Sequence, residues 1–232
     1  IRKYGLVAMP IIDHENCLVG IVTVDDAMYV LQDETTEDIS IMAGVSPNED
    51  SYFGTSVFRH AKNRTLWLML LMLSATVTGE ILRHYEEAMS VMPVLITFIP
   101  MLMGTSGNCG SQSSTMVIRG LAVGEIEFRD FLRVIFKEIR VALVVGLLLA
   151  AVNGIRIYLM YNQDIMLAFA LGVTMIAVIV MAKCIGCTLP LLAKKIGVDP
   201  AIMAAPLIST IMDTCTILMY FTIITAFFRL GG

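Results

Sequence analysis

The chain has 232 residues, of which 57% are hydrophobic and 16% are charged, and its mean hydropathy is +0.79. These values exceed those of soluble domains and predict a membrane protein. The net charge of −4 comes without a basic block, which argues against a nucleic-acid partner. Charged residues concentrate in positions 1–64, so we expect a polar N-terminal part followed by a membrane part.

The N-terminal residues predict two strands and the start of a helix. Apolar segments at 6–12 and 18–24 flank a predicted turn at 13–16, and the acidic pair Asp25 and Asp26 is typical of a helix N-terminus. Two strands and one helix cannot close a hydrophobic core alone. We therefore expect residues 1–40 to be the closing part of a domain that begins earlier.

The next segment is acidic and then amphipathic. Residues 32–38 contain four carboxylates, which fit either a solvated helix face or a weak divalent-cation site, because hard cations prefer oxygen ligands. Residues 51–64 predict an amphipathic helix inside a connecting segment at 41–64. That helix would lie on the membrane surface or at the mouth of a pore.

Five apolar segments then predict an all-α membrane domain over residues 65–232. They lie at about 65–83, 91–118, 132–161, 165–193 and 200–228. As one helix the last would be about 43 Å long, more than the ~30 Å hydrocarbon core of a bilayer.

Basic residues gather on one side of these segments. That side carries Arg59, Lys62, Arg64, Arg119, Arg129, Arg133, Lys137, Arg140, Lys194 and Lys195, and the other carries Arg83, Arg156 and Arg229. The positive-inside rule then places the N-terminus in the cytoplasm. Five spans would leave the C-terminus outside.

The cysteines predict neither disulfides nor a metal centre. All five lie in cytoplasmic or membrane segments, where disulfides are rare. Cys184 and Cys187 have CxxC spacing, but a zinc or redox site would need further Cys or His partners nearby in the sequence. We favour small-residue packing between helices as the reason for this motif.

Asp213 is the one charged residue in the apolar segment 200–228. An ionised carboxylate at mid-membrane costs at least ~2.5 kcal/mol, and it is tolerated when it faces a bundle interior, a cavity or a counter-charge. A protonated carboxyl bonded to a neighbouring helix is the alternative. We interpret Asp213 as part of a cation pathway.

A polar interruption at 104–115 lies inside the second apolar segment. Helical spacing places Gly104, Asn108 and Gln112 on one face, and Ser209 and Asp213 are also four residues apart. A Gly carbonyl, amide oxygens, a hydroxyl and a carboxylate are hard ligands that suit Mg²⁺, including a hydrated ion. Packing of small residues explains the glycines and serines, but not the other side chains together.

These motifs resemble the MgtE magnesium channels over essentially the whole chain. The similarity rests on Pro100 and the polar run 104–114, on 119–122 and 124–126, and on 197–201, 206–213 and the acidic linker 34–38. Ser106 and Cys109 depart from the family's usual Gly and Ala. Residues 20–26 are similar to the closing half of a CBS module, in which Thr23 and Asp26 would hold a nucleotide.

The resemblance implies a homodimer in a bacterial plasma membrane, with five spans per subunit and one pore on the two-fold axis. It places Asp213, Asn108, Ser209 and the Gly104 carbonyl around a hydrated Mg²⁺. It assigns regulatory Mg²⁺ to the carboxylates Glu34, Glu37, Asp38 and Asp199, and ATP to an intact CBS pair.

The expected function is a Mg²⁺-selective channel gated by cytoplasmic Mg²⁺, not an enzyme. An exchanger coupled to Na⁺ or H⁺ is the alternative, and it would need a second titratable position, for which Glu80 and Lys183 are the candidates. An intramembrane aspartyl protease would need two catalytic aspartates, and only Asp213 is central. The sequence does not rank Mg²⁺ above Mn²⁺, Co²⁺ or Ca²⁺.

Overall fold

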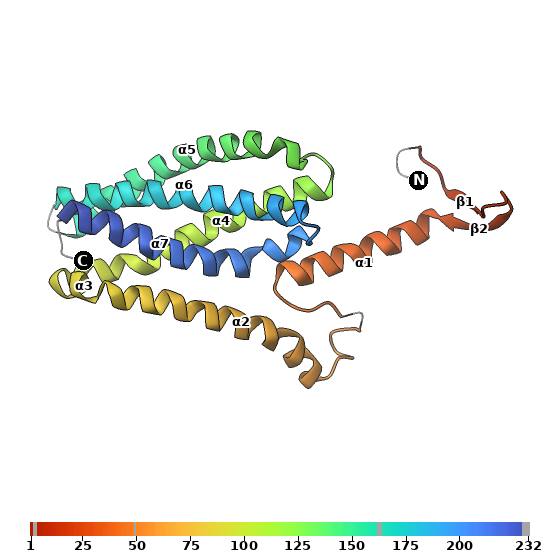
Figure 1. Ribbon diagram of the computed structural model, residues 1–232, viewed down its shortest axis with the longest axis horizontal. Coiled ribbons are helices and arrows are strands. Elements are labelled where there is room, and N and C mark those ends of the chain that lie inside the picture. Colours follow the sequence, from red (N-terminus) through yellow and green to blue (C-terminus); the bar gives the residue numbers. More distant parts are fainter. Residues whose placement is uncertain (2–3, 49, 162–163, 229–232) are drawn as a thin grey trace.

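The computed structural model describes residues 1, 4–48, 50–161 and 164–228, and Arg229 lies outside them. Within these residues a strand hairpin precedes a long helix and a bundle of membrane-length helices (Figure 1). The elements are β1 Ala8–Ile12, β2 Leu18–Thr23, α1 Val24–Met42, α2 Val57–His84, α3 Glu86–Val91, η1 Pro93–Phe98, α4 Ile99–Ala122, η2 Phe128–Asp130, α5 Phe131–Met160, α6 Ile165–Lys195, η3 Pro200–Met203 and α7 Ala205–Phe228.

The N-terminal hairpin and α1 form as expected. Strands β1 and β2 pair antiparallel, and the turn between them is closed by the Asp13 carboxylate, which accepts from the backbone N–H groups of Glu15 and Cys17. Thr23 caps α1, and Asp26 bonds back to the Thr23 backbone, which completes a capping box. Figure 1 shows this unit projecting away from the bundle.

The prediction of a separate connecting helix at 41–64 is wrong. Residues 43–48 and 50–56 form no α-helix, and residues 57–64 are the first turns of α2, which continues to His84. Gly44 ends the preceding helix in a left-handed conformation at φ +69°, and Pro47 disfavours helix at the residue before it. A Cβ at Gly44 would approach the Trp67 ring to 2.4 Å, so this turn packs closely on α2.

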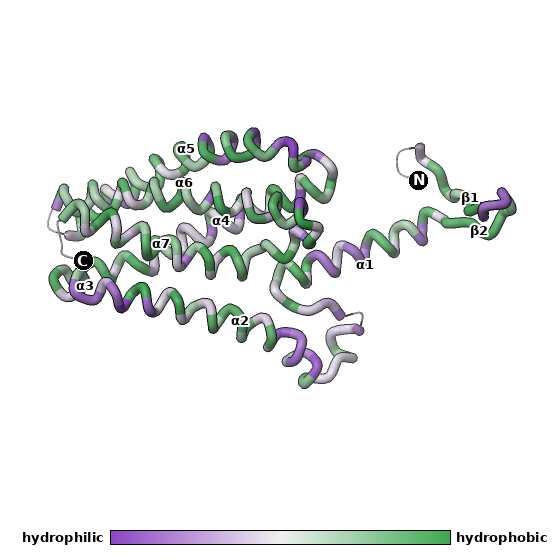
Figure 2. Tube along the Cα trace, in the orientation of Figure 1, coloured by the Kyte–Doolittle hydropathy of each residue, from purple (hydrophilic) through white to green (hydrophobic). Residues whose placement is uncertain are grey.

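Helices α4, α6 and α7 form the centre of the bundle. Helix α5 packs along α6 on one edge and α2 packs against α7 on the other (Figure 1). Among the described helices, α2, α6 and α7 are long and apolar enough to cross a membrane. The polar run lowers the hydropathy of α4 (Figure 2), and five spans stay a prediction.

Prolines divide two of the predicted apolar segments. The expected segment 91–118 is split into the end of α3, the 3₁₀ turn η1 that begins with Pro93, and α4, which has Pro100 in its first turn. The last segment is split into η3 and α7. Proline lacks a backbone N–H and is accommodated in the first turn of a helix, which explains both breaks. Helix α7 is still about 36 Å long.

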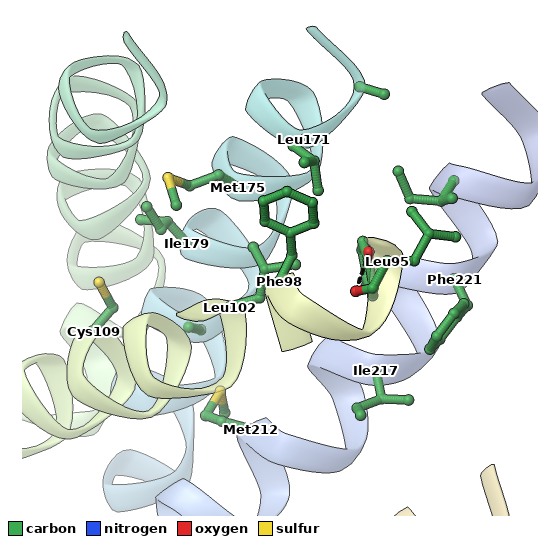
Figure 3. Close-up of a cluster of buried hydrophobic side chains, with 14 of the residues drawn as sticks. Leu95, Phe98, Leu102, Cys109, Leu171, Met175, Ile179, Met212, Ile217 and Phe221 are labelled. Carbon is green, nitrogen blue, oxygen red and sulfur yellow. Dashed lines mark hydrogen bonds between the residues drawn. The ribbon is translucent and has the colours of Figure 1, made fainter. Parts of the chain in front are cut away.

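The core lies where α4 meets α6 and α7. Figure 3 shows Leu95, Phe98 and Leu102 between side chains of α6 and α7, and all three are at most 2% exposed. Glycine allows the closest approach: a Cβ at Gly186 of α6 would lie 2.3 Å from the Gly110 carbonyl oxygen of α4. Small residues of this kind let membrane helices pack backbone to backbone.

Candidate functional site

The polar run 104–115 remains helical and divides into two faces. Helix α4 is continuous from Ile99 to Ala122, and Gly104, Asn108 and Gln112 are exposed along one side. This confirms the prediction that the three share a face. Three small polar residues of the same run, Ser106, Ser113 and Ser114, are at most 1% exposed and face the bundle.

Helix α7 runs antiparallel to α4 and brings Asp213 to the level of this exposed face. At one end of the contact, Ser114 Oγ of α4 donates to the Met203 carbonyl just before α7. Further along, Gly110 and Gly107 of α4 face Ile208 and Ser209 of α7. At the other end, Thr216 Oγ1 of α7 donates to Ser106 Oγ of α4 over 2.7 Å. Later residues of α7 therefore meet earlier residues of α4. Asp213 lies between Ser209 and Thr216, level with the turn from Gly104 to Asn108.

The Asp213 carboxylate is half-buried and has no partner among the described residues. It accepts no hydrogen bond and forms no ion pair within that part of the chain, although its helix neighbour Thr214 bonds Thr78 of α2 over 2.7 Å. The alternative of a carboxyl bonded to a neighbouring helix therefore finds no support in one chain. Its oxygens are free to contact an ion or its water shell.

Ser209 lies one turn before Asp213 and is also half-buried. Its Oγ is 3.4 Å from the position that a Cβ on Gly107 would occupy, so the hydroxyl sits at the seam between α4 and α7. The structure thus places Ser209 at the contact between α4 and α7, and Asp213 one helical turn further along α7.

Among the described residues, no group of three His, Cys, Asp or Glu side chains lies close enough to hold a metal ion. The oxygens on the two helices are instead a single carboxylate with neutral donors. Mg²⁺ dehydrates reluctantly and keeps several waters, so such a set suits a hydrated ion.

A buried polar cluster joins α4, α5 and α6, and the sequence did not reveal it. Ser113 Oγ donates to Glu138 Oε2 over 2.6 Å, and Lys183 Nζ donates to Ser113 Oγ over 3.2 Å and lies 3.6 Å from Glu138. Both charged side chains are largely buried. Lys183 was visible as a charge within an apolar segment, but Glu138 lay among cytoplasmic charges and gave no sign of being its partner.

The departure from the family pattern at Ser106 has a structural role. Its hydroxyl is fully buried, accepts from Thr216 of α7 and donates to the Met103 carbonyl over 2.9 Å. A glycine here would leave the Thr216 hydroxyl without this acceptor. Cys109 is also buried, so both departures lie on the packing face of α4 and away from Asn108.

Three of the four expected regulatory carboxylates lie near one another: Glu34 and Asp38 on α1, and Asp199 at the start of η3. Partial burial and then the nearby charges of Asp199 and Glu34 raise the pKa of Asp38 above its usual value. Asp199 also caps η3, since its Oδ1 accepts from the Ala201 N–H over 2.8 Å. Glu37 lies elsewhere and lines a hollow of about 440 Å³ with Asp33, Ser40, Pro47 and others.

Thr23 and Asp26 are engaged with each other. Thr23 Oγ1 donates to Asp26 Oδ2 over 2.7 Å, and this bond and that from the Thr23 N–H lower the pKa of the carboxyl. The capping box accounts for both side chains without a ligand. Nucleotide binding at these residues stays a prediction.

The CxxC pair has a packing explanation. All five cysteines are free, Cys187 is fully buried, and its Sγ donates to the Cys184 carbonyl over 3.2 Å. Gly186 between them makes the close approach to Gly110. These contacts support helix packing as the reason for the motif.

Comparison with known proteins gives a consistent result. A family profile described as "Divalent cation transporter" matches residues 99–223, more than half of the chain. The chain is 36% identical over 220 residues to the magnesium transporter MgtE of Thermus thermophilus, 35% over 232 to that of Enterococcus faecalis and 34% over 227 to that of Bacillus subtilis. These matches cover 95%, 99% and 98% of this chain but only about half of each relative, at 48%, 50% and 50%. The chain therefore belongs to the MgtE family of divalent cation transporters.

Proposed function

We propose that this chain forms the ion pathway of a Mg²⁺ channel, in which two copies place their Asp213 carboxylates around one hydrated ion. The observation that carries the proposal is the Asp213 carboxylate, which lies inside the apolar helix α7, level with the exposed polar face of α4, and has no bonding partner among the described residues. An intramembrane carboxylate of this kind is stable when water or a cation meets it. The relatives' description as magnesium transporters supports Mg²⁺ as the ion.

The exposed face of α4 argues for a second copy. Asn108 and Gln112 are polar groups on the outside of a single bundle, where lipid would leave them unsatisfied. A two-fold axis beside this face would bring together two sets of Gly104, Asn108, Ser209 and Asp213. The two carboxylates would then match the charge of one divalent cation, and the neutral oxygens would bond its waters.

Passive flow is sufficient for uptake in this proposal. A divalent ion that crosses the whole membrane field gains about 4.6 kcal/mol per 100 mV, which is twice the value for a single charge. The site needs no nucleotide hydrolysis, and its selectivity rests on the size and hydration of the ion.

The exchanger alternative loses both of its candidate residues. Glu80 is exposed near the end of α2 and lies 3.6 Å from Arg83, while Lys183 is buried and engaged by Glu138 and Ser113. Neither forms an ion pair or hydrogen bond with Asp213 among the described residues. We therefore favour a channel over exchange with Na⁺ or H⁺.

Gating follows from the contact between α1 and η3. Asp38 and Asp199 repel each other at neutral pH, and a divalent cation between them would offset that repulsion. In the sequence, α1 precedes α2, whose Thr78 bonds Thr214 next to Asp213. Cytoplasmic Mg²⁺ would thereby hold α1 against the bundle and favour a closed pore.

The experiment is a flux assay with the full-length protein in liposomes. We expect Mg²⁺ entry without a Na⁺ or pH gradient, and loss of entry in Asp213→Asn. Flux that stops when the Na⁺ or pH gradient is removed would favour the exchanger. Parallel assays with Mn²⁺, Co²⁺ and Ca²⁺ rank the ions.

A further inference from the structure

Helix α5 carries a basic stripe that becomes apolar along the same face. Arg133, Lys137 and Arg140 follow at intervals of four and three residues, so they lie on one side of the helix. Val141 and Val144 continue that side into the apolar part of the helix. Figure 2 shows this change along α5, from hydrophilic residues in its first turns to hydrophobic residues further on.

Two adjoining hollows lie along this stripe. The first, of about 800 Å³, is lined by the basic residues Arg119, Arg129, Arg133, Lys137 and Arg140, together with Glu125, Asp130, Glu138 and apolar residues of α4. The second, of about 490 Å³, is lined by Lys137, Arg140, Val141, Val144 and Val145. Lys137 and Arg140 border both, so the basic hollow adjoins a shallow apolar one.

Most basic residues of the first hollow have no ion-pair partner in the part of the chain that the structure describes. Arg129 pairs with Glu127 at 3.0 Å, but Arg119, Arg133, Lys137 and Arg140 form no ion pair among the described residues. The lining has three acidic residues against five basic ones: Glu138 is engaged by Lys183 and Ser113, Asp130 accepts from the Glu127 N–H over 3.2 Å, and Glu125 is the third. The first hollow therefore favours an anionic ligand.

We propose that this groove binds one anionic phospholipid, with its phosphate between Arg133, Lys137 and Arg140 and an acyl chain along Val141 and Val144. Arginine and lysine are the side chains that bind phosphate best, and basic pockets at the cytoplasmic ends of membrane helices suit anionic headgroups. The stripe lies at the end of the bundle that the positive-inside rule assigns to the cytoplasm. The apolar hollow beside the basic residues accommodates an acyl chain, which is why we propose a lipid and not a free phosphate.

The test is native mass spectrometry of the full-length protein titrated with phosphatidylglycerol, with phosphatidylcholine of the same acyl chains, and with glycerol 1-phosphate. We expect tight binding of phosphatidylglycerol alone. At roughly 1 kcal/mol per basic residue, Arg133→Gln with Lys137→Gln weakens that binding about thirtyfold. The matched control Lys62→Gln with Arg64→Gln removes two charges on the same side of the membrane outside the groove, and it should leave binding unchanged.

A second variant tests the apolar hollow. Val144→Trp fills the apolar hollow without changing charge, so it should weaken phosphatidylglycerol binding about tenfold and leave any binding of glycerol 1-phosphate unaltered. Three results would overturn the proposal: equal binding of phosphatidylcholine, equal losses in the charge variant and its control, or full binding of phosphatidylglycerol in Val144→Trp. Full binding in Val144→Trp would show that the acyl chain does not occupy the apolar hollow, so that the site binds the phosphate alone. Flux through Asp213 need not change in any of these variants, so this test is separate from that of the ion pathway.

Discussion

The two faces of α4 are built from similar small polar residues but have different roles. On the buried face Ser106, Gly110, Ser113 and Ser114 have their hydrogen bonds and contacts met by α5, α6, α7 and η3. On the other face Gly104, Asn108 and Gln112 are exposed, and the side chains of Asn108 and Gln112 have no hydrogen-bond partner among the described residues. The comparison teaches that burial, and not residue type, separates the groups that hold the bundle from those available to an ion.

The largest effect on stability should come from breaking the buried cluster. Lys183→Met leaves Glu138 as an unpaired buried charge, which costs about 3–5 kcal/mol and should lower the melting temperature in detergent sharply. Lys183→Met with Glu138→Gln should recover most of that loss, because no charge is then left unpaired. Equal melting temperatures for the single variant and the wild type would show that water reaches the cluster.

Asp213→Asn should remove most Mg²⁺ flux while the fold is kept. The amide has the same shape and carries no charge, so the ion loses its main attraction in the membrane and flux should fall roughly a hundredfold. Liposome flux and the melting temperature are measured together. Asp213→Glu keeps the charge and should lose less. Wild-type flux in Asp213→Asn would remove Asp213 from the pathway.

Asn108→Ala and Ser113→Ala compare the two faces directly. Asn108→Ala should reduce Mg²⁺ permeation severalfold and leave the melting temperature unchanged, since its side chain is exposed in one chain. The sequence alone suggests that Ser113→Ala has little effect. The structure corrects this: loss of its bonds to Glu138 and Lys183 should cost about 1–2 kcal/mol of stability, with permeation intact. Similar behaviour of both variants would contradict the division of α4 into two faces.

The smallest effect concerns Asp38. Its pKa is raised in the folded protein, so this group stabilises the α1–η3 contact at low pH, and that contribution is lost as pH rises through the raised pKa. Mg²⁺ binding should therefore weaken on acidification, because protons and Mg²⁺ compete for the carboxylate. Asp38→Asn should protect α1 from hydrogen exchange in the absence of Mg²⁺ by severalfold, and Mg²⁺ should add little further protection. Glu37→Gln is the matched control and should resemble the wild type.

The sequence by itself determined the local elements and the chemistry of the polar run. Hydrophobic length indicated the membrane segments, the 3.6-residue period placed Gly104, Asn108 and Gln112 on one face, and the strand pattern with its acidic cap gave the hairpin and the start of α1. These features depend on neighbours within a few residues, which the sequence shows directly.

Only the tertiary structure decided which distant groups meet. Lys183 and Glu138 are 45 positions apart in the sequence, and Asp38 and Asp199 are 161 apart, so no local pattern pairs them. The end of α1 at Gly44 and the fusion of residues 57–64 with α2 also depend on how the turn packs on Trp67. Such contacts form because the helices bury small residues against one another, and the geometry of that packing settles which side chains lie within bonding distance.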